Sequence, residues 1–250
     1  MKHLLEGKVA IITGGTRGIG YAIVKQFAEC GATVILCGSR QATAEKALAQ
    51  LQEELPGVQA DAIWPALTDK ASVEAAFSTV HEKYGHIDIL ANNAGISQST
   101  HFSDYTEDEY DKIMNLNVKA VFVCSQVAAR FMKADGGGSI INTSSMVSLY
   151  GQPSGFAYPA SKFAVNGITK SLARELGKDH IRVNAVAPGI VHTDMVDKVP
   201  KEVIQPLINQ IPLGRMAEAD DIAHAFLYLA SDLASYVNGT VISVDGGIVV

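Results

Sequence analysis

The chain has 250 residues, a formal net charge of −6 and a hydrophobic content of 48%. This length suits one α/β domain or two small ones, with apolar residues enough for a large core. No block of Lys or Arg stands out, which argues against a nucleic-acid binder and against a polybasic membrane anchor. The first residues are too few and too polar for a signal peptide, and no apolar run approaches the ~20 residues of a membrane span. We therefore expect a soluble, cytoplasmic protein, with the three cysteines reduced and buried.

Short apolar runs alternate with segments of helical periodicity along the chain. The pattern predicts strands at residues 9–12, 33–37, 58–64, 87–91, 139–143, 181–186 and 241–244. It predicts helices at residues 19–30, 43–55, 72–84, 107–132 and 220–230, and another that contains Tyr158 and ends at Leu176. Strands this apolar are buried on both faces, as in a parallel sheet covered by helices. The prediction is an α/β fold: a Rossmann-type doubly wound parallel sheet of about seven strands with helices on both faces.

Residues 1–250 contain no linker or repeat, so one dinucleotide-binding and catalytic domain is expected. The irregular stretch from Gly189 to Arg215 contains Pro200, Pro206 and Pro212 and is long for a loop. We interpret residues 190–215 as a substrate lid.

A glycine-rich turn joins the first predicted strand to the first helix, with Gly14, Gly18 and Gly20 in a G-x-x-x-G-x-G spacing. Glycines permit a tight turn and close approach of a pyrophosphate, and the helix N-terminus adds unpaired N–H groups. The turn therefore predicts a dinucleotide phosphate site, although the commoner spacing is G-x-G-x-x-G.

Tyr158 and Lys162 lie one helical turn apart, so the phenol and the ammonium share a helix face. A positive charge near a phenol lowers the phenol pKa, and a tyrosine with a lowered pKa can serve as general acid or base. The Y-x-x-x-K pattern alone is weak because it arises by chance in many helices.

Several motifs together resemble the short-chain dehydrogenase/reductase family, in the family's order and over essentially the whole chain. These are the glycine turn, Asn92–Gly95, Asn117, Ser145, the Tyr158/Lys162 pair, and Pro188-Gly189 with Thr193. The resemblance implies that Tyr158 exchanges a proton with the substrate oxygen and that Ser145 hydrogen-bonds the same oxygen. It implies that Lys162 lowers the pKa of Tyr158 and holds the nicotinamide ribose, while Asn117 positions a relay water. Ser144 and Asn115 are the rival residues for the serine and asparagine roles.

By the same resemblance, the cofactor contacts come from the turn, the strand ends and the catalytic helix. They are Gly14, Thr16, Arg17, Gly18, Ile19, Gly20, Ser39, Arg40, Leu67, Asn93, Ala94, Gly95, Tyr158, Lys162, Pro188, Gly189, Ile190 and Thr193. No metal site is predicted.

The end of the second strand bears on the choice between NADP and NAD. An NAD enzyme usually has an acidic residue where this chain has Gly38, whereas Ser39, Arg40 and Arg17 form a plausible cradle for a 2′-phosphate. We therefore favour NADP(H), with NAD(H) as the alternative. At the third strand, Leu67 stands where an adenine contact is expected, and Asp61 is an acidic alternative in a less suitable register.

Two subgroups of the family compete for the substrate. Residues 155–162, 191–195 and 229–235 resemble microbial hydroxysteroid dehydrogenases, although those often use NAD. Bacterial 3-oxoacyl-carrier-protein reductases are the alternative. They usually bind the acidic carrier through arginines at two positions, which in this chain are occupied by Gly136 and Asp179. The predicted apolar cleft wall consists of Ile96, Met146, Tyr150, Phe156, Met195 and Val196.

The resemblance further implies a homotetramer that packs the helices near residues 107–132 and 157–178. A non-catalytic dinucleotide sensor or scaffold is a different class, disfavoured because all four catalytic positions are intact. The expected function is NAD(P)-dependent interconversion of a secondary alcohol and a ketone on an apolar small molecule.

Overall fold

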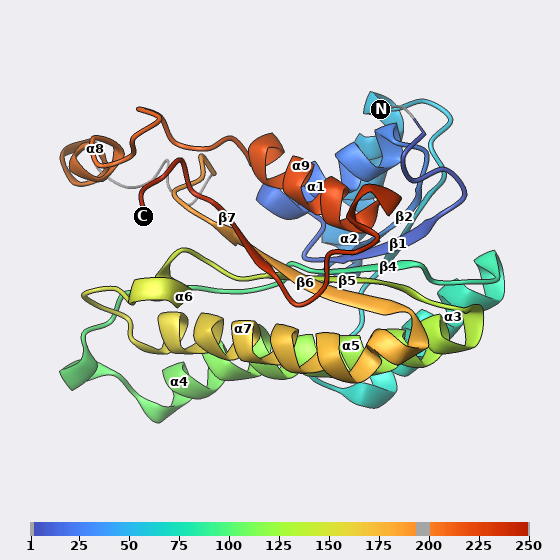
Figure 1. Cartoon of the computed structure of the whole chain (residues 1–250), viewed down its shortest axis with the longest axis horizontal. Coiled ribbons are helices and arrows are strands. Elements are labelled where there is room, and N and C mark those ends of the chain that lie inside the picture. The colour runs from blue at the N-terminus through green and yellow to red at the C-terminus, as the bar shows by residue number, and fades with distance from the viewer. Residues whose placement is uncertain (1–2, 194–200, 250) are drawn as a thin grey trace.

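The computed structural model describes residues 3–193 and 201–249. Within them, seven parallel strands form one sheet in the order β3-β2-β1-β4-β5-β6-β7 (Figure 1). The strands are β1 (Val9–Thr13), β2 (Thr33–Cys37), β3 (Ala60–Ile63), β4 (Ile89–Asn92), β5 (Gly138–Thr143), β6 (Ile181–Pro188) and β7 (Val241–Val244). The predicted doubly wound parallel sheet is confirmed.

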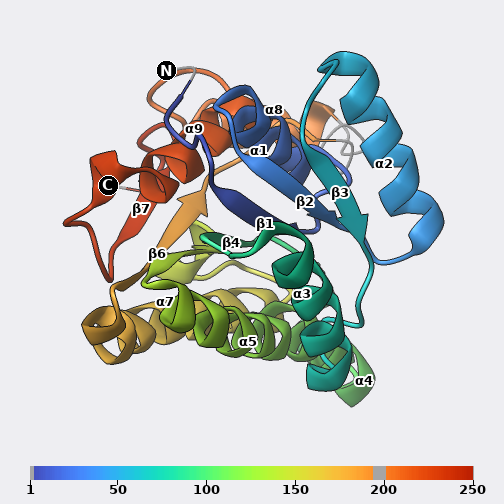
Figure 2. The ribbon, with the colours of Figure 1, turned by 90° about the vertical axis from the view of Figure 1, so that its right-hand side faces the viewer.

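Helices cover both faces of the sheet, as Figure 2 shows from the side. One layer holds α1 (Gly18–Glu29), α2 (Gln41–Glu54) and α9 (Ala219–Ala230). The other holds α3 (Lys70–Tyr84), α4 (Glu107–Met114), α5 (Ala120–Asp135) and α7 (Ala157–Leu176). The short helix α6 (Val147–Tyr150) and α8 (Lys201–Ile208) lie at one end of the molecule (Figure 1). Single 3-10 turns occur at residues 102–104, 177–179 and 232–234.

The central strands are apolar at most positions because both of their faces are covered. Successive side chains of a strand point to opposite faces, so Ile12 and Leu36 join the core under α1, α2 and α9. Ile11 and Ile35 join the second core, under α3, α5 and α7. All four are 0% exposed, as expected for the interior of a parallel sheet.

Three predicted elements differ in the structure. The strand expected at 58–64 is shorter, and β3 is only half-buried because it forms an edge of the sheet. The helix expected at 107–132 is interrupted by a π-helical turn at Asn115–Lys119, between α4 and α5. The stretch 190–215 is not wholly irregular, since α8 lies within it and accommodates Pro206.

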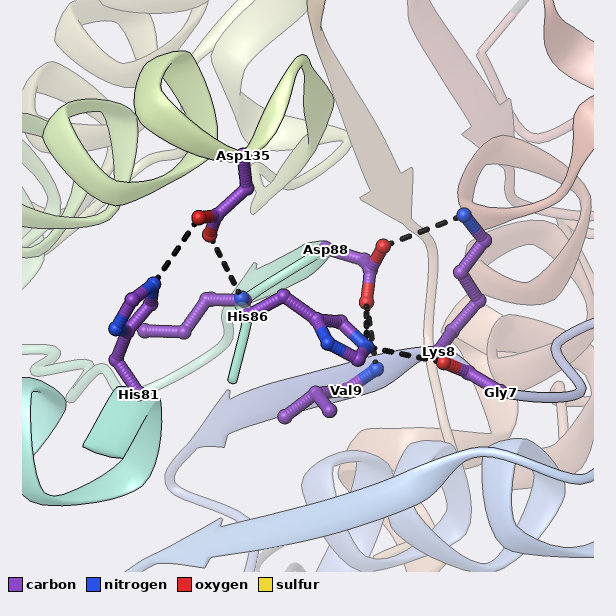
Figure 3. A network of polar contacts seen from close by, with 8 residues as sticks. Gly7, Lys8, Val9, His81, His86, Asp88 and Asp135 are labelled. Carbon is purple, nitrogen blue, oxygen red and sulfur yellow. Dashed lines mark hydrogen bonds and ion pairs between the residues drawn. The ribbon is translucent and has the colours of Figure 1, made fainter. Parts of the chain in front are cut away.

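Two carboxylates anchor the backbone at the amino ends of the central strands (Figure 3). Asp88 accepts a hydrogen bond from the N–H of Val9 at 2.8 Å, and His86 Nε2 lies 3.2 Å from its carboxylate. Asp135, at the end of α5, accepts from the N–H of Ile87 at 3.3 Å. These contacts lie at the opposite edge of the sheet from the carboxyl ends, where ligands bind in such folds.

Candidate active site

The order of the strands reverses between β1 and β4, and the glycine turn lies at this switch point. Gly14 has φ of 65°, and a Cβ there would lie 3.0 Å from the Cα of Ala94. A Cβ on Gly20 would lie 2.1 Å from the carbonyl oxygen of Gly14. Both positions therefore require glycine, and the turn brings the backbone after β1 against the backbone after β4.

The N-terminus of α1 is open for an anion. The residue before it, Arg17, is extended and makes no side-chain cap, and the first turn of α1 carries no acidic residue. By contrast, side chains form capping boxes at α4 and α9. The first N–H groups of a helix lack partners within the helix, so a pyrophosphate suits this end of α1. The turn thus fits the dinucleotide that the sequence predicts.

Thr13 and Asn93 fasten the two strand ends together. The Thr13 hydroxyl oxygen accepts from the N–H groups of Asn93 at 2.9 Å and Ala94 at 3.0 Å. Asn93 Nδ2 donates to the carbonyl oxygens of Thr13 at 3.2 Å and Gly14 at 3.3 Å. The Asn93 side chain therefore holds the turn. Thr13 was missed in the sequence, where its one signal is a hydroxyl at the end of an otherwise apolar strand.

Tyr158 and Lys162 lie in the first turns of α7, beside the end of β5. The Lys162 ammonium lies 5.7 Å from the centre of the Tyr158 ring and donates to the carbonyl oxygen of Thr143 at 2.7 Å. The Ser145 side chain lies near enough to Tyr158 to act on the pKa of its phenol. The structure therefore brings three of the predicted catalytic side chains together.

Burial dominates the protonation of this pair. Desolvation lowers the pKa of Lys162 to about 8. Burial also raises the pKa of Tyr158, and the Ser145 side chain acts against that rise. The lowered tyrosine pKa predicted from the Tyr–Lys spacing is therefore wrong for this structure. The Lys162 charge is directed at the Thr143 carbonyl, and desolvation of the phenolate outweighs the effect of Ser145.

Asn117 lies in the π-helical turn, a feature often found at functional sites. Its Nδ2 donates to the carbonyl oxygen of Ile96 at 2.8 Å and to Ser161 Oγ at 3.0 Å, while its Oδ1 accepts from the Ile96 N–H at 2.9 Å. Ser161 in turn donates to the carbonyl oxygen of Tyr158 at 2.6 Å. The side chain is thus occupied by the protein and links the chain after β4 to α7. Its rival Asn115 is exposed.

The two adjacent serines after β5 have different surroundings. Ser144 is 1% exposed, and its hydroxyl contacts Asn166 Oδ1 at 2.6 Å and Ser148 Oγ at 3.0 Å. Ser145 Oγ accepts a weak hydrogen bond from the Val147 N–H at 3.4 Å, and its side chain acts to lower the pKa of Tyr158. Ser145 therefore faces the tyrosine, whereas Ser144 is engaged in packing α6 against α7.

The end of β2 lies next to the glycine turn. A Cβ on Gly38 would lie 2.9 Å from Ala44 Cβ and 3.0 Å from Thr16 Cγ2, so an acidic residue there would crowd both neighbours. Arg17 and Arg40 are exposed, and each immediately precedes a helix in extended conformation.

The two candidates for the adenine contact differ in availability. Leu67 packs partly against the core under α3, so only part of it is accessible. Asp61 is bound to Lys83 Nζ and to the Tyr84 hydroxyl, each at 2.6 Å. The Asp61 carboxylate is therefore held by α3.

The segment after β6 approaches the glycine turn from the other side. The Pro188 carbonyl oxygen accepts from the Met146 N–H at 2.9 Å, which joins this segment to the turn that carries Ser145. The Ile190 carbonyl oxygen accepts from the Ala217 N–H at 2.9 Å, which fixes the backbone of Ile190 beside the start of α9. A Cβ on Gly18 would lie 3.8 Å from Thr193 Cγ2, which places Thr193 at the start of α1.

A cavity of about 350 Å³ opens beside Tyr158. Its lining comes from the loop after β4 and the loop before α7: Ser97, Gln98, Ser99, Gln152, Pro153, Ser154 and Tyr158.

The apolar wall predicted from the sequence does not line this cavity. Ile96, Met146, Tyr150 and Phe156 are not among its lining residues, and Met195 and Val196 fall outside the described residues. Phe156 instead packs on Phe102, Tyr105 and Tyr110. Sequence periodicity could not reveal these polar residues because they lie in irregular loops.

A parallel sheet with a glycine turn at its switch point and a tyrosine–lysine pair beside a cavity defines a dinucleotide-dependent oxidoreductase. A family model described as "Enoyl-(Acyl carrier protein) reductase" matches residues 14–249. The chain belongs to the short-chain dehydrogenase/reductase family, which implies a nicotinamide dinucleotide cofactor.

Known relatives cover nearly the whole chain. A 3alpha-hydroxysteroid dehydrogenase of Mediterraneibacter gnavus is 63% identical over 246 residues, covering 98% of both chains. A 3-oxoacyl-[acyl-carrier-protein] reductase of Thermotoga maritima is 42% identical, covering 98% of this chain and 99% of the relative. A solved short-chain alcohol dehydrogenase of Sinorhizobium meliloti, described as putative, is 34% identical with a TM-score of 0.92, covering 98% of this chain and 97% of that one. None of the described helices has the length and apolar character needed to cross a membrane.

Proposed function

We propose that this enzyme interconverts a secondary alcohol and a ketone on a hydroxysteroid-type substrate, with a nicotinamide cofactor. The observation that carries the reaction is the position of Ser145 next to Tyr158 beside the cavity, where the serine side chain acts to lower the pKa of the phenol. Two hydroxyl groups converge where a substrate oxygen would lie, as needed to stabilise charge that develops on it. The 63% identity to a 3alpha-hydroxysteroid dehydrogenase supports the substrate class.

Each catalytic side chain has a distinct role in this proposal. When bound, the nicotinamide supplies or accepts the hydride. Tyr158 gives a proton to the carbonyl oxygen during reduction, and Ser145 holds that oxygen by a hydrogen bond. Lys162, with its pKa lowered to about 8, exchanges protons near neutral pH and holds the ribose hydroxyls. Asn117 positions the segment after β4 against α7, and the proposal retains its part in the relay to solvent.

The cofactor lies across the carboxyl ends of β1 and β4 in this proposal. The proposal assigns the cofactor contacts to the glycine turn, the ends of β2 and β4 and the segment after β6, and the close approach of Gly14 to Ala94 supports this. NADP is preferred to NAD, supported by the exposed Arg17 and Arg40 and by the crowding that an acidic residue would meet at Gly38. The proposal retains residues 190–215, of which 194–200 lie outside the described residues, as a lid on a single dinucleotide-binding and catalytic domain.

A 3-oxoacyl-carrier-protein reductase is the second candidate, supported by relatives at 42% identity or lower. The charges at the expected carrier surface disfavour it. Lys133 is paired with Asp179 at 3.0 Å, so this cation is neutralised beside the positions expected to carry arginines. An acidic carrier would find little electrostatic steering there.

The proposal includes a cytoplasmic homotetramer. Phe122 on α5 and Phe163 on α7 are 51% and 49% exposed, and large exposed apolar side chains on neighbouring helices suit burial against another copy. Cys30, Cys37 and Cys124 are free and buried, as suits a reducing compartment.

A small matrix of assays tests the function. Reduction is measured with NADPH and NADH against a 3-oxo bile acid, an acetoacetyl thioester and a simple cyclic ketone. We expect the 3-oxo bile acid to have the highest kcat/KM. The Tyr158→Phe variant should lose at least a hundredfold in kcat while its dinucleotide affinity stays within twofold, because the proton donor contributes about 10²–10⁴-fold. A preference for the thioester would favour the second candidate, and turnover unchanged by Tyr158→Phe would refute the role of Tyr158.

A further inference from the structure

The cavity beside Tyr158 has polar walls, which an apolar steroid skeleton alone would not explain. Five of its seven lining residues are serines or glutamines. Ligand pockets are usually apolar with a few polar groups that set orientation and specificity. The polar groups here lie on the two loops that flank Tyr158, so they would meet a part of the substrate away from the reacting carbon.

Gln98 is held in one orientation by its neighbours. Its Nε2 donates to the carboxylate of Glu109 and to Thr100 Oγ1 at 2.9 Å. The hydrogen bond from the backbone of Thr106 lowers the pKa of Glu109, so the carboxylate stays ionised and can only accept. The Gln98 atom that faces Glu109 must therefore be the NH₂ group, which leaves its carbonyl oxygen on the other side of the amide.

Gln152 is oriented in the same manner from the opposite loop. Its Nε2 donates to the carbonyl oxygen of Gly155 at 3.2 Å, and a carbonyl oxygen can only accept. Within the described residues, the carbonyl oxygens of Gln98 and Gln152 receive no hydrogen bond from the protein. Gln98, whose two amide N–H groups are both used, therefore offers the cavity only an acceptor, whereas Gln152 offers an acceptor beside one remaining N–H.

The two loops are locked together, so the acceptors are fixed before a ligand arrives. The Gly155 N–H donates to the Thr100 carbonyl oxygen at 2.9 Å. Gly155 has φ of 67°, and a Cβ there would lie 1.8 Å from the backbone carbonyl oxygen of Gln98. Only glycine permits this approach. A fixed pair of acceptors costs less entropy on binding than a mobile pair.

We propose that Gln98 and Gln152 are specificity residues that accept hydrogen bonds from a hydroxyl group of the substrate remote from the carbon that reacts. Two fixed acceptors favour a substrate group that donates hydrogen bonds at that place. The preferred substrate is then a steroid that carries at least one further ring hydroxyl. This inference rests on the proposed function and names the substrate class within it.

The test compares kcat/KM for a 3-oxo bile acid without further ring hydroxyls and for its 7- and 12-hydroxylated counterparts. We expect the better hydroxylated ketone to exceed the unsubstituted one roughly tenfold, the effect of a partly exposed hydrogen bond. Gln152→Met and Gln98→Met keep side-chain length but remove the acceptor, so each should bring this ratio toward one. Gln50→Met is the matched control, because Gln50 also donates to a glutamate, at 2.8 Å, but lies on α2.

Each outcome has a separate meaning. A wild-type ratio near one, or a ratio that both methionine variants leave unchanged, would overturn the inference while the steroid reductase activity stands. If a simple cyclic ketone is reduced and all the steroids are inert, the proposed substrate class is wrong and the inference falls with it.

Discussion

The Lys162 ammonium donates a hydrogen bond of 2.7 Å to the carbonyl oxygen of Thr143, which ties the start of α7 to the end of β5. Lys162 is only 5% exposed, so this bond replaces part of the hydration that its ammonium loses on burial. It is a single bond to a neutral partner, so the ammonium keeps part of its desolvation cost. The site thus holds its lysine in place while making its charged form unfavourable, as suits a residue that must release a proton near neutral pH.

The buried charge of Lys162 predicts a pH-dependent cost to stability. Its pKa is about 8 in the folded protein against 10.5 as the ordinary value. Between these values the unfolded chain binds more protons, so this lysine makes the free energy of unfolding increase from pH 8 to 10.5. Lys162→Met removes the effect. The stability of the wild type relative to Lys162→Met should therefore rise by on the order of 2–3 kcal/mol across that range. Denaturant unfolding at pH 7, 9 and 10.5 measures it, and a constant difference would contradict the lowered pKa.

The different surroundings of Ser144 and Ser145 predict that replacing Ser145 mainly lowers activity and that replacing Ser144 mainly lowers stability. Ser145→Ala removes one of two hydroxyls aimed at the substrate oxygen, so kcat should fall about 10²–10³-fold with little change in dinucleotide affinity. Ser144→Ala instead leaves Asn166 and Ser148 short of a partner in a buried site. It should cost about 1–2 kcal/mol of unfolding free energy and less than tenfold in kcat. Steady-state kinetics and thermal unfolding of both variants provide the measurement. If Ser144→Ala lost more activity than Ser145→Ala, the assignment of the two serines would be reversed.

Much of this site could be predicted because its residues follow regular elements. Tyr158 and Lys162 share a helix face by spacing alone, and Gly14 marks a turn whose strand and helix have clear periodicities. The type of sheet could also be predicted, because apolar strands that alternate with helices are compatible with only a few topologies.

Other features depend on contacts that a linear pattern does not encode. The acceptor for Lys162 is a backbone carbonyl, which any residue at position 143 would supply. The π-helical turn around Asn117 interrupts an apparently continuous helix, and no proline or glycine marks it. The raised pKa of Tyr158 reflects burial by the folded chain, whereas helical spacing reports only the neighbouring charge.

The two arginines beside the cofactor position predict a selective effect on NADPH. Replacing Arg17 and Arg40 together by Ala removes the charges proposed to hold a 2′-phosphate, so the KM for NADPH should rise at least tenfold while that for NADH changes less than threefold. Arg174→Ala, on α7, serves as a control for loss of a basic residue. Equal increases for both cofactors would refute the preference for NADP.

The crowding at Gly38 predicts how the preference could be reversed. Gly38→Asp puts a side chain against Ala44 Cβ at 2.9 Å, so it should cost about 1–3 kcal/mol of stability while disfavouring NADPH through charge repulsion. Ala44→Gly removes that contact, although glycine in a helix itself costs about 1 kcal/mol. The double variant should therefore unfold at a higher temperature than Gly38→Asp alone and should use NADH better than NADPH. If the second substitution only adds to the loss, the steric explanation is wrong.

The contacts of the Asp88 carboxylate predict that its replacement lowers the stability of the fold without affecting catalysis. It accepts from the Val9 N–H and from Lys8 Nζ, at 2.8 and 3.2 Å, at the amino ends of β1 and β4 (Figure 3). Asp88→Asn keeps the shape but removes the charge, so the hydrogen bond to Val9 and the ion pair with Lys8 weaken. The loss should be about 1–3 kcal/mol of unfolding free energy.

The same variant should keep kcat and both cofactor KM values within twofold, because the active site lies at the opposite edge of the sheet. Glu53→Gln, an exposed neutralisation on α2, controls for the change in net charge and should cost less than about 0.5 kcal/mol. Urea unfolding and steady-state kinetics on the three proteins provide the measurement. A loss of activity without a loss of stability in Asp88→Asn would show that this edge communicates with the site, because the contacts described here anchor only the amino ends of the strands.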